Sequence, residues 1–127
     1  MSQQTTFTGK EWFKEGNIYE FEIVNIQGKS KYISKKTGEP YCKQSFFFTH
    51  DYLQQPLEQR LFENQVAEIL IALGYSEEKN NEGKTIIKWD DDEVIGQKIK
   101  AMVTFRTYIN TKGKEKKAID LINFQGV

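Results

Sequence analysis

Two long stretches of the chain alternate apolar and polar residues, and this period of two constrains the fold most. The first is IYEFEIVNI, which starts at Ile18, and the second is KIKAMVTFRTYI, which starts at Lys98. Successive side chains of a β-strand point to opposite faces of a sheet, so both stretches are predicted strands with one buried face. A polar turn with glycine follows each, KKTGEP or NTKGKEKK, and then an apolar run, YCKQSFFF or AIDLINF. The pattern predicts two β-hairpins, with KSKYISK prolonging the first strand.

The middle of the chain changes to a helical period. Apolar side chains recur three or four positions apart after Pro56, a residue that suits the first turn of a helix. They are Leu57, Leu61, Phe62, Val66, Ile69, Leu70 and Leu73. Gly74 follows in the position of a C-terminal cap, so the pattern predicts one helix over about residues 57–73. A polar loop, a short predicted strand TIIKW and the acidic turn DDDE lead to the second hairpin.

The order hairpin, helix, hairpin predicts a single mainly β domain over residues 1–127, in which residues 1–10 are expected to be flexible. Five short, strongly bent strands with a helix between the third and the fourth describe the OB-fold, a small β-barrel. We therefore predict a five-stranded OB-fold-like barrel with one helix between its third and fourth strands. Its third strand could come from residues 46–52, residues 85–89 or the segment FTGKEWF. An open α+β sheet covered by one helix is the alternative architecture.

The net charge is zero, but the charges are segregated along the chain. Residues 29–43 carry five lysines and one glutamate, and residues 94–127 carry seven basic and two acidic side chains. Between them, residues 44–93 carry four basic and eleven acidic side chains. Such segregation acquires a function if the two basic segments meet in space.

The sequence indicates a cytoplasmic protein without membrane contact. No apolar run is long enough for a membrane-spanning helix, and the segment MSQQTTFTGK lacks the basic-then-apolar order of a signal peptide. The single cysteine, Cys42, cannot form an internal disulfide, which fits a reducing compartment.

Candidate catalytic and metal-binding residues are few. His50 is the only histidine, and its neighbour Asp51 comes without a positioned nucleophile, so a structural or simply exposed histidine is favoured. We interpret Cys42 as a small half-buried apolar side chain rather than a reactive thiol. The run DDDE, from Asp90 to Glu93, lacks the spacing of a calcium loop, which favours a solvated loop that caps the next element. We expect neither an enzyme nor a cofactor or metal site.

Basic side chains interleaved with aromatic rings on the two hairpins indicate a binding protein for single-stranded nucleic acid. Such proteins place cations along the phosphate backbone and flat rings against the bases. The candidate binding residues are Lys31, Tyr32, Lys35, Lys36, Tyr41, Lys43, Phe47, Lys100, Arg106, Tyr108, Lys112, Lys114, Lys116 and Lys117. Aromatic residues on strands more often pack in the core, and this is the role expected of Phe21, Phe46, Phe48 and Phe105.

Two other functions remain open. A protein-binding adaptor or inhibitor would use the acidic middle segment as a mimic of nucleic acid. Its acidic groups would be the DDDE loop and the residues expected on the exposed face of the helix, Glu58, Glu63 and Glu68. An RNA-binding domain would use the same cations and rings as a DNA-binding one.

Three segments carry a resemblance to a known family: the helix end ILIALGY, the strand start VIGQK and the turn TKGKEKK. In this layout the chain resembles, over roughly residues 16–125, the small OB-fold single-stranded DNA-binding proteins of bacteriophages, above all those of lactococcal and related Gram-positive-host phages. The resemblance implies DNA binding in phage replication or recombination, in the cytoplasm of the bacterial host. It implies DNA lying between the two hairpin loops, near Lys35, Lys36 and residues 112–117. Replication or recombination proteins are the implied partners, and a homodimer would lengthen the DNA track.

Overall fold

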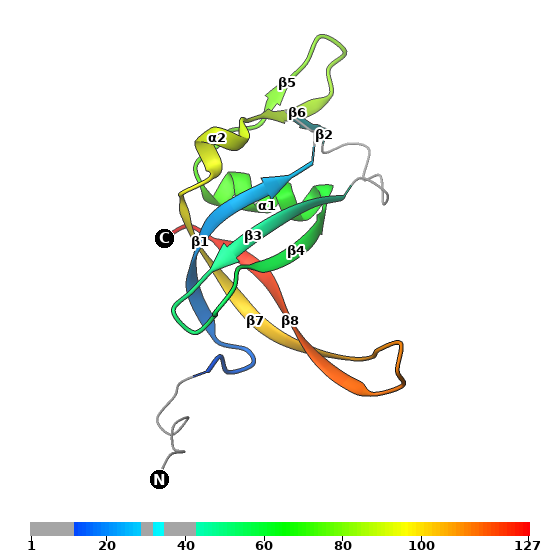
Figure 1. Ribbon diagram of the computed structural model, residues 1–127. Coiled ribbons are helices and arrows are strands. Elements are labelled where there is room, and N and C mark those ends of the chain that lie inside the picture. The colour runs from blue at the N-terminus through cyan, green and yellow to red at the C-terminus, as the bar shows by residue number, and fades with distance from the viewer. Residues whose placement is uncertain (1–11, 29–31, 35–42) are drawn as a thin grey trace.

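The computed structural model describes residues 12–28, 32–34 and 43–127, and this part of the chain is mainly β (Figure 1). The strands are β1 (Ile18–Gln27), β2 (Tyr32–Ser34), β3 (Lys43–Thr49), β4 (Leu57–Phe62), β5 (Glu78–Lys79), β6 (Thr85–Lys88), β7 (Lys98–Ile109) and β8 (Glu115–Gln125). The helices are α1 (Glu63–Ala72) and the short α2 (Asp91–Val94). No helix in these ranges is long and apolar enough to cross a membrane.

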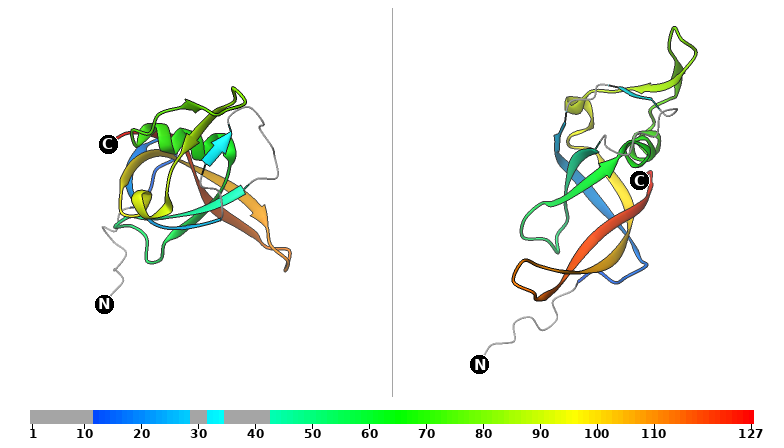
Figure 2. Two further views of the ribbon diagram at one scale, coloured as in Figure 1. Left: turned by 90° about the horizontal axis from the view of Figure 1, so that it is seen from above. Right: turned by 90° about the vertical axis from the view of Figure 1, so that its right-hand side faces the viewer.

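Five of the strands form one antiparallel sheet in the order β4-β3-β1-β7-β8. Along the chain, α1 comes after the third strand of this sheet and before the fourth, as predicted. The sheet is strongly curved (Figure 2). Its ladder of backbone hydrogen bonds ends at β4 on one side and at β8 on the other, so the described strands do not close into a barrel. The other three strands form a small sheet in the order β2-β6-β5.

One side chain spans the gap between the two edge strands of the large sheet. Gln59 of β4 donates from Nε2 to the carbonyl oxygen of Ile119 in β8, at 3.0 Å. Its Oε1 accepts from the backbone N–H of Leu121, also at 3.0 Å. Gln59 is only 9% exposed, and a buried amide of this kind needs such partners. We call this junction of β4 and β8 the seam.

The core lies inside the curve of the sheet and is covered by α1. Phe21, Phe46 and Phe48 are at most 1% exposed, which confirms the prediction for these three rings. Each such side chain contributes about 1.5–3 kcal/mol through burial. Phe105, which was also expected in the core, is only half-buried and packs at its rim. The helix contributes one buried face, made of Val66, Ala67, Ile69 and Leu70.

The predicted helix begins too early. Residues 57–62 form β4, the third strand of the large sheet, so none of the three segments considered for that strand is correct. Leu57, Gln59 and Leu61 point inward. Because the middle one of these three side chains is polar, the apolar residues of this segment do not alternate, and the pattern of a strand could not be recognised from them. The end of the helix is as predicted, because Gly74 follows it with φ +104°, in the left-handed region that favours glycine.

The small sheet confirms one expectation and corrects another. The predicted strand TIIKW is present as β6. The segment of β2 does not prolong β1, because Tyr32 pairs with Lys88 of β6. The chain leaves β1 at Gly28, which has φ +139°, and a Cβ there would lie 2.6 Å from Cγ of Gln44. Both the backbone angle and the close approach require glycine at this point.

Candidate nucleic-acid interface

The β7–β8 hairpin projects beyond the rest of the sheet (Figure 1). β1 pairs with β7 only from Lys98 to Met102, whereas β8 follows β7 out to Ile109. Beyond the reach of β1 the hairpin is therefore a two-stranded ribbon. We call residues 104–117 the arm.

The tip of the arm is a tight turn fixed by Asn110 and Gly113. Asn110 Oδ1 accepts from the backbone N–H groups of Lys112 (2.9 Å) and Lys114 (3.0 Å). Gly113 has φ +76°, which glycine adopts without steric cost. The turn holds both strands in register and leaves its lysine side chains exposed.

Four of the predicted DNA-binding lysines lie on the arm. Lys112, Lys114, Lys116 and Lys117 are exposed, and none forms an ion pair with another residue of the described ranges. Tyr108 stands directly opposite Lys116 and is 42% exposed. The arm thus combines exposed cations with a ring open to solvent, as the sequence predicts for this hairpin.

Arg106 is oriented by an ion pair on the same hairpin. Its Nε lies 2.8 Å from Asp120 Oδ2, and its second contact, from Nη2 to Oδ1, is 3.3 Å. The hydrogen bond and the charge of Asp120 raise the pKa of Arg106, which stays protonated. Its Cζ is 5.8 Å from the centre of the Tyr108 ring, within the range of a cation–π contact. Asp120 offsets part of the positive charge but holds the guanidinium beside the exposed ring.

A second group of cations and rings lies on the outer face of β3 and β4. Lys43 Nζ is 4.7 Å from the centre of the Phe62 ring, which is 38% exposed. Arg60 is exposed one outward position away on β4, and Phe47 is half-buried on β3. We call these four residues the β3–β4 cluster. Glu58 stands opposite Phe47 and pairs with Arg60 at 3.7 Å, so one carboxylate lies among the cations.

The arm and the β3–β4 cluster share one outer surface because the seam joins β4 to β8. These two strands run in the same direction, with the arm before the seam on β8 and Phe62 after it on β4. At about 3.3 Å per residue, Lys116 and Phe62 are separated by roughly 20–25 Å along the strands. A nucleic-acid strand that contacts both groups would therefore cross the seam.

The other six predicted residues either lie outside the described residues or belong to other parts of the fold. Four of them lie outside the described residues: Lys31, Lys35, Lys36 and Tyr41. Tyr32 belongs to β2 of the small sheet rather than to the large one. Lys100 faces outward on β7 but stands directly opposite Glu20 of β1, which offsets its charge.

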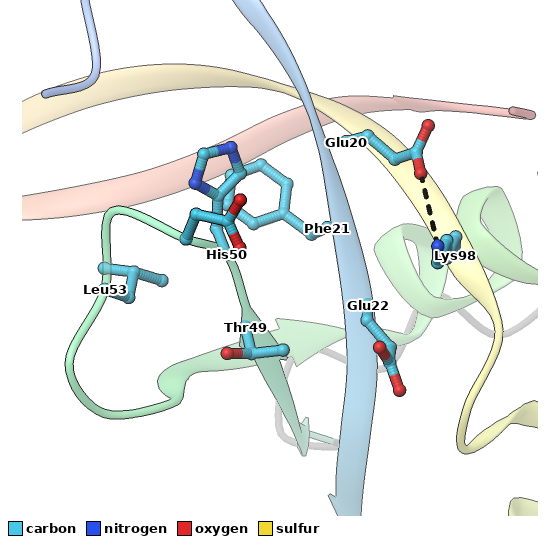
Figure 3. A pocket seen from close by; sticks show the side chains of 8 residues that line it. Glu20, Phe21, Glu22, Thr49, His50, Leu53 and Lys98 are labelled. Carbon is cyan, nitrogen blue, oxygen red and sulfur yellow. Dashed lines mark ion pairs between the residues drawn. The ribbon is translucent and has the colours of Figure 1, made fainter. Parts of the chain in front are cut away.

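A pocket of about 490 Å³ opens over β1 and the loop between β3 and β4 (Figure 3). It is lined by Glu20, Phe21, Glu22, Thr49, His50, Asp51, Leu53 and Lys98. Its three carboxylates outnumber its single ammonium group, and an acidic hollow repels phosphate. The pocket is therefore a separate feature from the basic surface.

His50 is packed into a cluster of rings beside this pocket. Its ring centre is 4.5 Å from that of Tyr52 and 4.9 Å from that of Phe13. Its Nδ1 accepts from the backbone N–H of Tyr52 at 3.0 Å. Burial lowers the pKa of His50, although the charge of Asp51 acts in the opposite direction. These contacts are those of a structural histidine.

The run DDDE, expected as a solvated loop, instead provides the N-cap Asp90 and the first three residues of α2. Asp90 Oδ1 accepts from the backbone N–H of Asp92 at 3.3 Å, so the predicted capping role is confirmed. Glu93 accepts from the hydroxyl of Tyr75 at 3.1 Å. In the part of the chain that the structure describes, no group of three or more His, Cys, Asp or Glu residues is placed to hold a metal ion.

Arg60 and Phe62 are binding candidates that sequence reasoning missed. Assigning residues 57–73 to a helix placed Phe62 among the core residues. The signal was present in LEQRLF, since a strand there sets Glu58, Arg60 and Phe62 on one exposed face.

Comparisons of the chain with models of known protein families, with curated proteins and with solved structures found no match.

Proposed function

We propose that the chain is a single-stranded DNA-binding protein without strong sequence preference, built on an OB-fold-like barrel. The observation that carries the proposal is the arm, where four exposed lysines surround Tyr108 and Arg106 on a hairpin that leaves the core. The strand order and the helix after the third strand of the large sheet favour this architecture. Gln59 supports it further, because it joins the two strands whose pairing would close the barrel.

Phosphates and bases would be bound by different side chains. The lysines of the arm would neutralise phosphates, and each neutralised phosphate adds roughly 0.7 to the negative log–log slope of affinity against salt. Tyr108 and Phe62 offer exposed rings on which bases stack, worth about 1–3 kcal/mol per base. Stacking and phosphate contacts tolerate any base, so weak sequence preference follows.

The bound strand would run from the arm across the seam to the β3–β4 cluster. Beyond the seam, Arg60 and Lys43 supply cations, and Phe47 adds a half-buried ring. The candidates that precede Lys43 in the chain stay predictions for the far end of the track: Lys31, Tyr32, Lys35, Lys36 and Tyr41.

The biological setting is proposed from the sequence resemblance. It assigns the protein to phage DNA replication or recombination in the cytoplasm of the bacterial host, with proteins of those processes as partners. RNA binding would employ the same arm, so the test below includes an RNA strand.

The protein-binding alternative is favoured less by the placement of the acidic residues. Glu58 lies on β4 next to Arg60 and not on the helix. Glu68 lies on α1, and its Oε1 accepts from the backbone N–H of Phe124 at 3.2 Å. These carboxylates are engaged within the fold rather than gathered on one helix face.

The proposal is tested by fluorescence anisotropy with labelled oligo-dT, oligo-rU and a DNA duplex of equal length across a salt series. We expect oligo-dT to bind and the duplex not to bind, with affinity that falls as salt rises. Equal or tighter binding of oligo-rU would move the assignment to RNA. The absence of any binding at low salt would overturn the proposal and favour the protein-binding adaptor.

A charge-reversal variant locates the site. Changing Lys112, Lys114 and Lys116 to Glu should reduce oligo-dT affinity by about a hundredfold or more and flatten the salt slope by roughly 2. The control changes Lys79 and Lys84 to Glu on the β5–β6 hairpin, at the other end of the molecule from the arm (Figure 1), and leaves Lys88 unchanged because it stands opposite the candidate Tyr32. Equal losses in both variants would mean that overall charge, and not the arm, determines binding.

A further inference from the structure

The outer face of β1 and β7, away from the seam, carries two parallel columns of side chains with opposite charge. The column on β1 is acidic and that on β7 is basic, and at the same end of the face each column has an apolar residue, Ile18 on β1 and Met102 on β7. The directly opposed pairs are Ile18–Met102, Glu20–Lys100 and Glu22–Lys98. The order of the rows along the two strands is therefore apolar, charged, charged.

We propose that this face binds a second copy of the chain about a two-fold axis that runs parallel to the strands, between β1 and β7. Rotation about this axis lays β1 of one copy over β7 of the other, row by row. Glu20 then meets Lys100 of the partner subunit, and Glu22 meets the partner's Lys98. Because a two-fold contact is isologous, each of these pairs forms twice.

The charge pattern favours this two-fold axis over the other two-fold axis that would stack the same faces of two copies. A two-fold axis that runs across the strands would lay β1 over β1 and set glutamate against glutamate. Like charges opposed at an interface cost several kcal/mol, so that arrangement is disfavoured. The parallel axis also matches the way in which sheets stack face to face, with strand directions within about 30°.

The shape and the apolar row of this face suit a partner. Ile18 is 44% exposed, and the row continues through Met102 to Ile122 of β8, which stands opposite Met102. The pocket over β1 is lined by Glu20 and Glu22, so lysine side chains of the second copy would enter an acidic hollow (Figure 3).

Within one chain these charges are only loosely paired. Lys98 Nζ and Glu20 Oε2 are 3.9 Å apart, with side chains 60% and 43% exposed. An exposed pair of this kind contributes little, and salt screens it. Contact with a second copy would remove water from the pair and add the pairs across the interface. A contact built mainly on charge should be weak and should weaken further as salt rises.

The test is a charge swap followed by analytical ultracentrifugation of the free protein at low and high salt, without DNA. Wild type should show a monomer–dimer equilibrium at low salt. The variant Glu20→Lys with Glu22→Lys and the variant Lys98→Glu with Lys100→Glu should each dimerise at least about tenfold more weakly. Their mixture should restore a dimer of one copy of each, because opposite charges again face each other in every row.

The matched control is Glu78→Lys with Glu82→Lys, which makes the same charge change on the small sheet and should leave dimerisation unchanged. Circular dichroism confirms folding of each variant, and the single change Met102→Glu tests the apolar row independently. Wild type that stays monomeric at its highest attainable concentration, or a dimer that survives both charge reversals, would overturn the proposal. Oligo-dT binding is measured separately, so failure here leaves the DNA-binding proposal standing.

Discussion

The two halves of the β7–β8 hairpin share one ladder of hydrogen bonds but differ in the burial of their side chains. In the inner half, Val103 stands opposite Leu121, and the two side chains are 0% and 1% exposed. In the outer half, Tyr108 stands opposite Lys116 and is 42% exposed, and Ile109 is 71% exposed. Strand pairing is therefore compatible with either a packed or a solvated face. The inner half is fixed by the core, while the outer half is free to carry side chains for binding.

This difference predicts that stability and binding can be separated along a single hairpin. Changes in the inner half should alter the free energy of unfolding and leave the binding of the folded protein intact. Changes in the outer half should do the reverse, because solvated side chains contribute little to stability.

The largest expected effect is a loss of unfolding free energy when the seam, which holds the inner half of β8, is changed. Gln59→Leu keeps the size of the side chain but leaves the carbonyl of Ile119 and the N–H of Leu121 without their partner. Each group left unpaired costs about 1–3 kcal/mol of unfolding free energy. Urea denaturation measures the loss, and Gln55→Leu, at an exposed position, is the matched control that should stay within about 0.5 kcal/mol of wild type. Equal stability of the two variants would show that the seam does not hold the sheet together.

A smaller effect is expected in the outer half, and on binding alone. Tyr108→Ala removes the exposed ring beside Arg106 and should weaken oligo-dT binding by about 1–3 kcal/mol, with unchanged stability. Tyr108→Phe retains the ring and should bind as wild type does. If the alanine variant also unfolded more easily in urea, the contrast between the halves would be wrong.

The smallest effect concerns pH and the boundary between the halves. The backbone N–H of Gly16 donates to the carbonyl oxygen of Val103 at 2.8 Å. The ring of Phe13, three residues before Gly16 in the chain, packs against His50. Because burial lowers the pKa of His50 below its ordinary value of 6.5, the unfolded chain binds more protons than the folded one as pH falls below that value. Stability should therefore be full above pH 6.5 and decline as the solution is acidified.

Urea denaturation at a series of pH values measures this decline, and His50→Gln is the control. Glutamine does not titrate and keeps an oxygen that can accept from Tyr52. The variant should lose the slope between pH 6.5 and the lowered pKa of the folded state. An unchanged slope would assign the pH dependence to carboxylates instead.

The local sequence pattern was sufficient to predict the strands in which apolar and polar side chains alternate without interruption. Both hairpin strands that begin at Ile18 and Lys98 are where the period of two puts them. The Asn110–Gly113 turn places the arm's lysines in solvent, as its sequence indicates. The period failed over residues 57–62, where an inward Gln59 interrupts the apolar side of the strand. That misassignment also concealed Phe62 as an exposed ring.

By itself the sequence determined the mainly β character, the end of the helix before Gly74 and the basic arm, since all of these follow from period, turn chemistry and charge over a few residues. Only the tertiary structure decided what lies next to what. Gln59 is polar and inward because β8, sixty residues away, supplies its partners. Lys100 stands against Glu20 because β1 pairs with β7 in that register. These contacts join segments that are distant in the sequence, so they cannot be predicted from the local pattern of either segment.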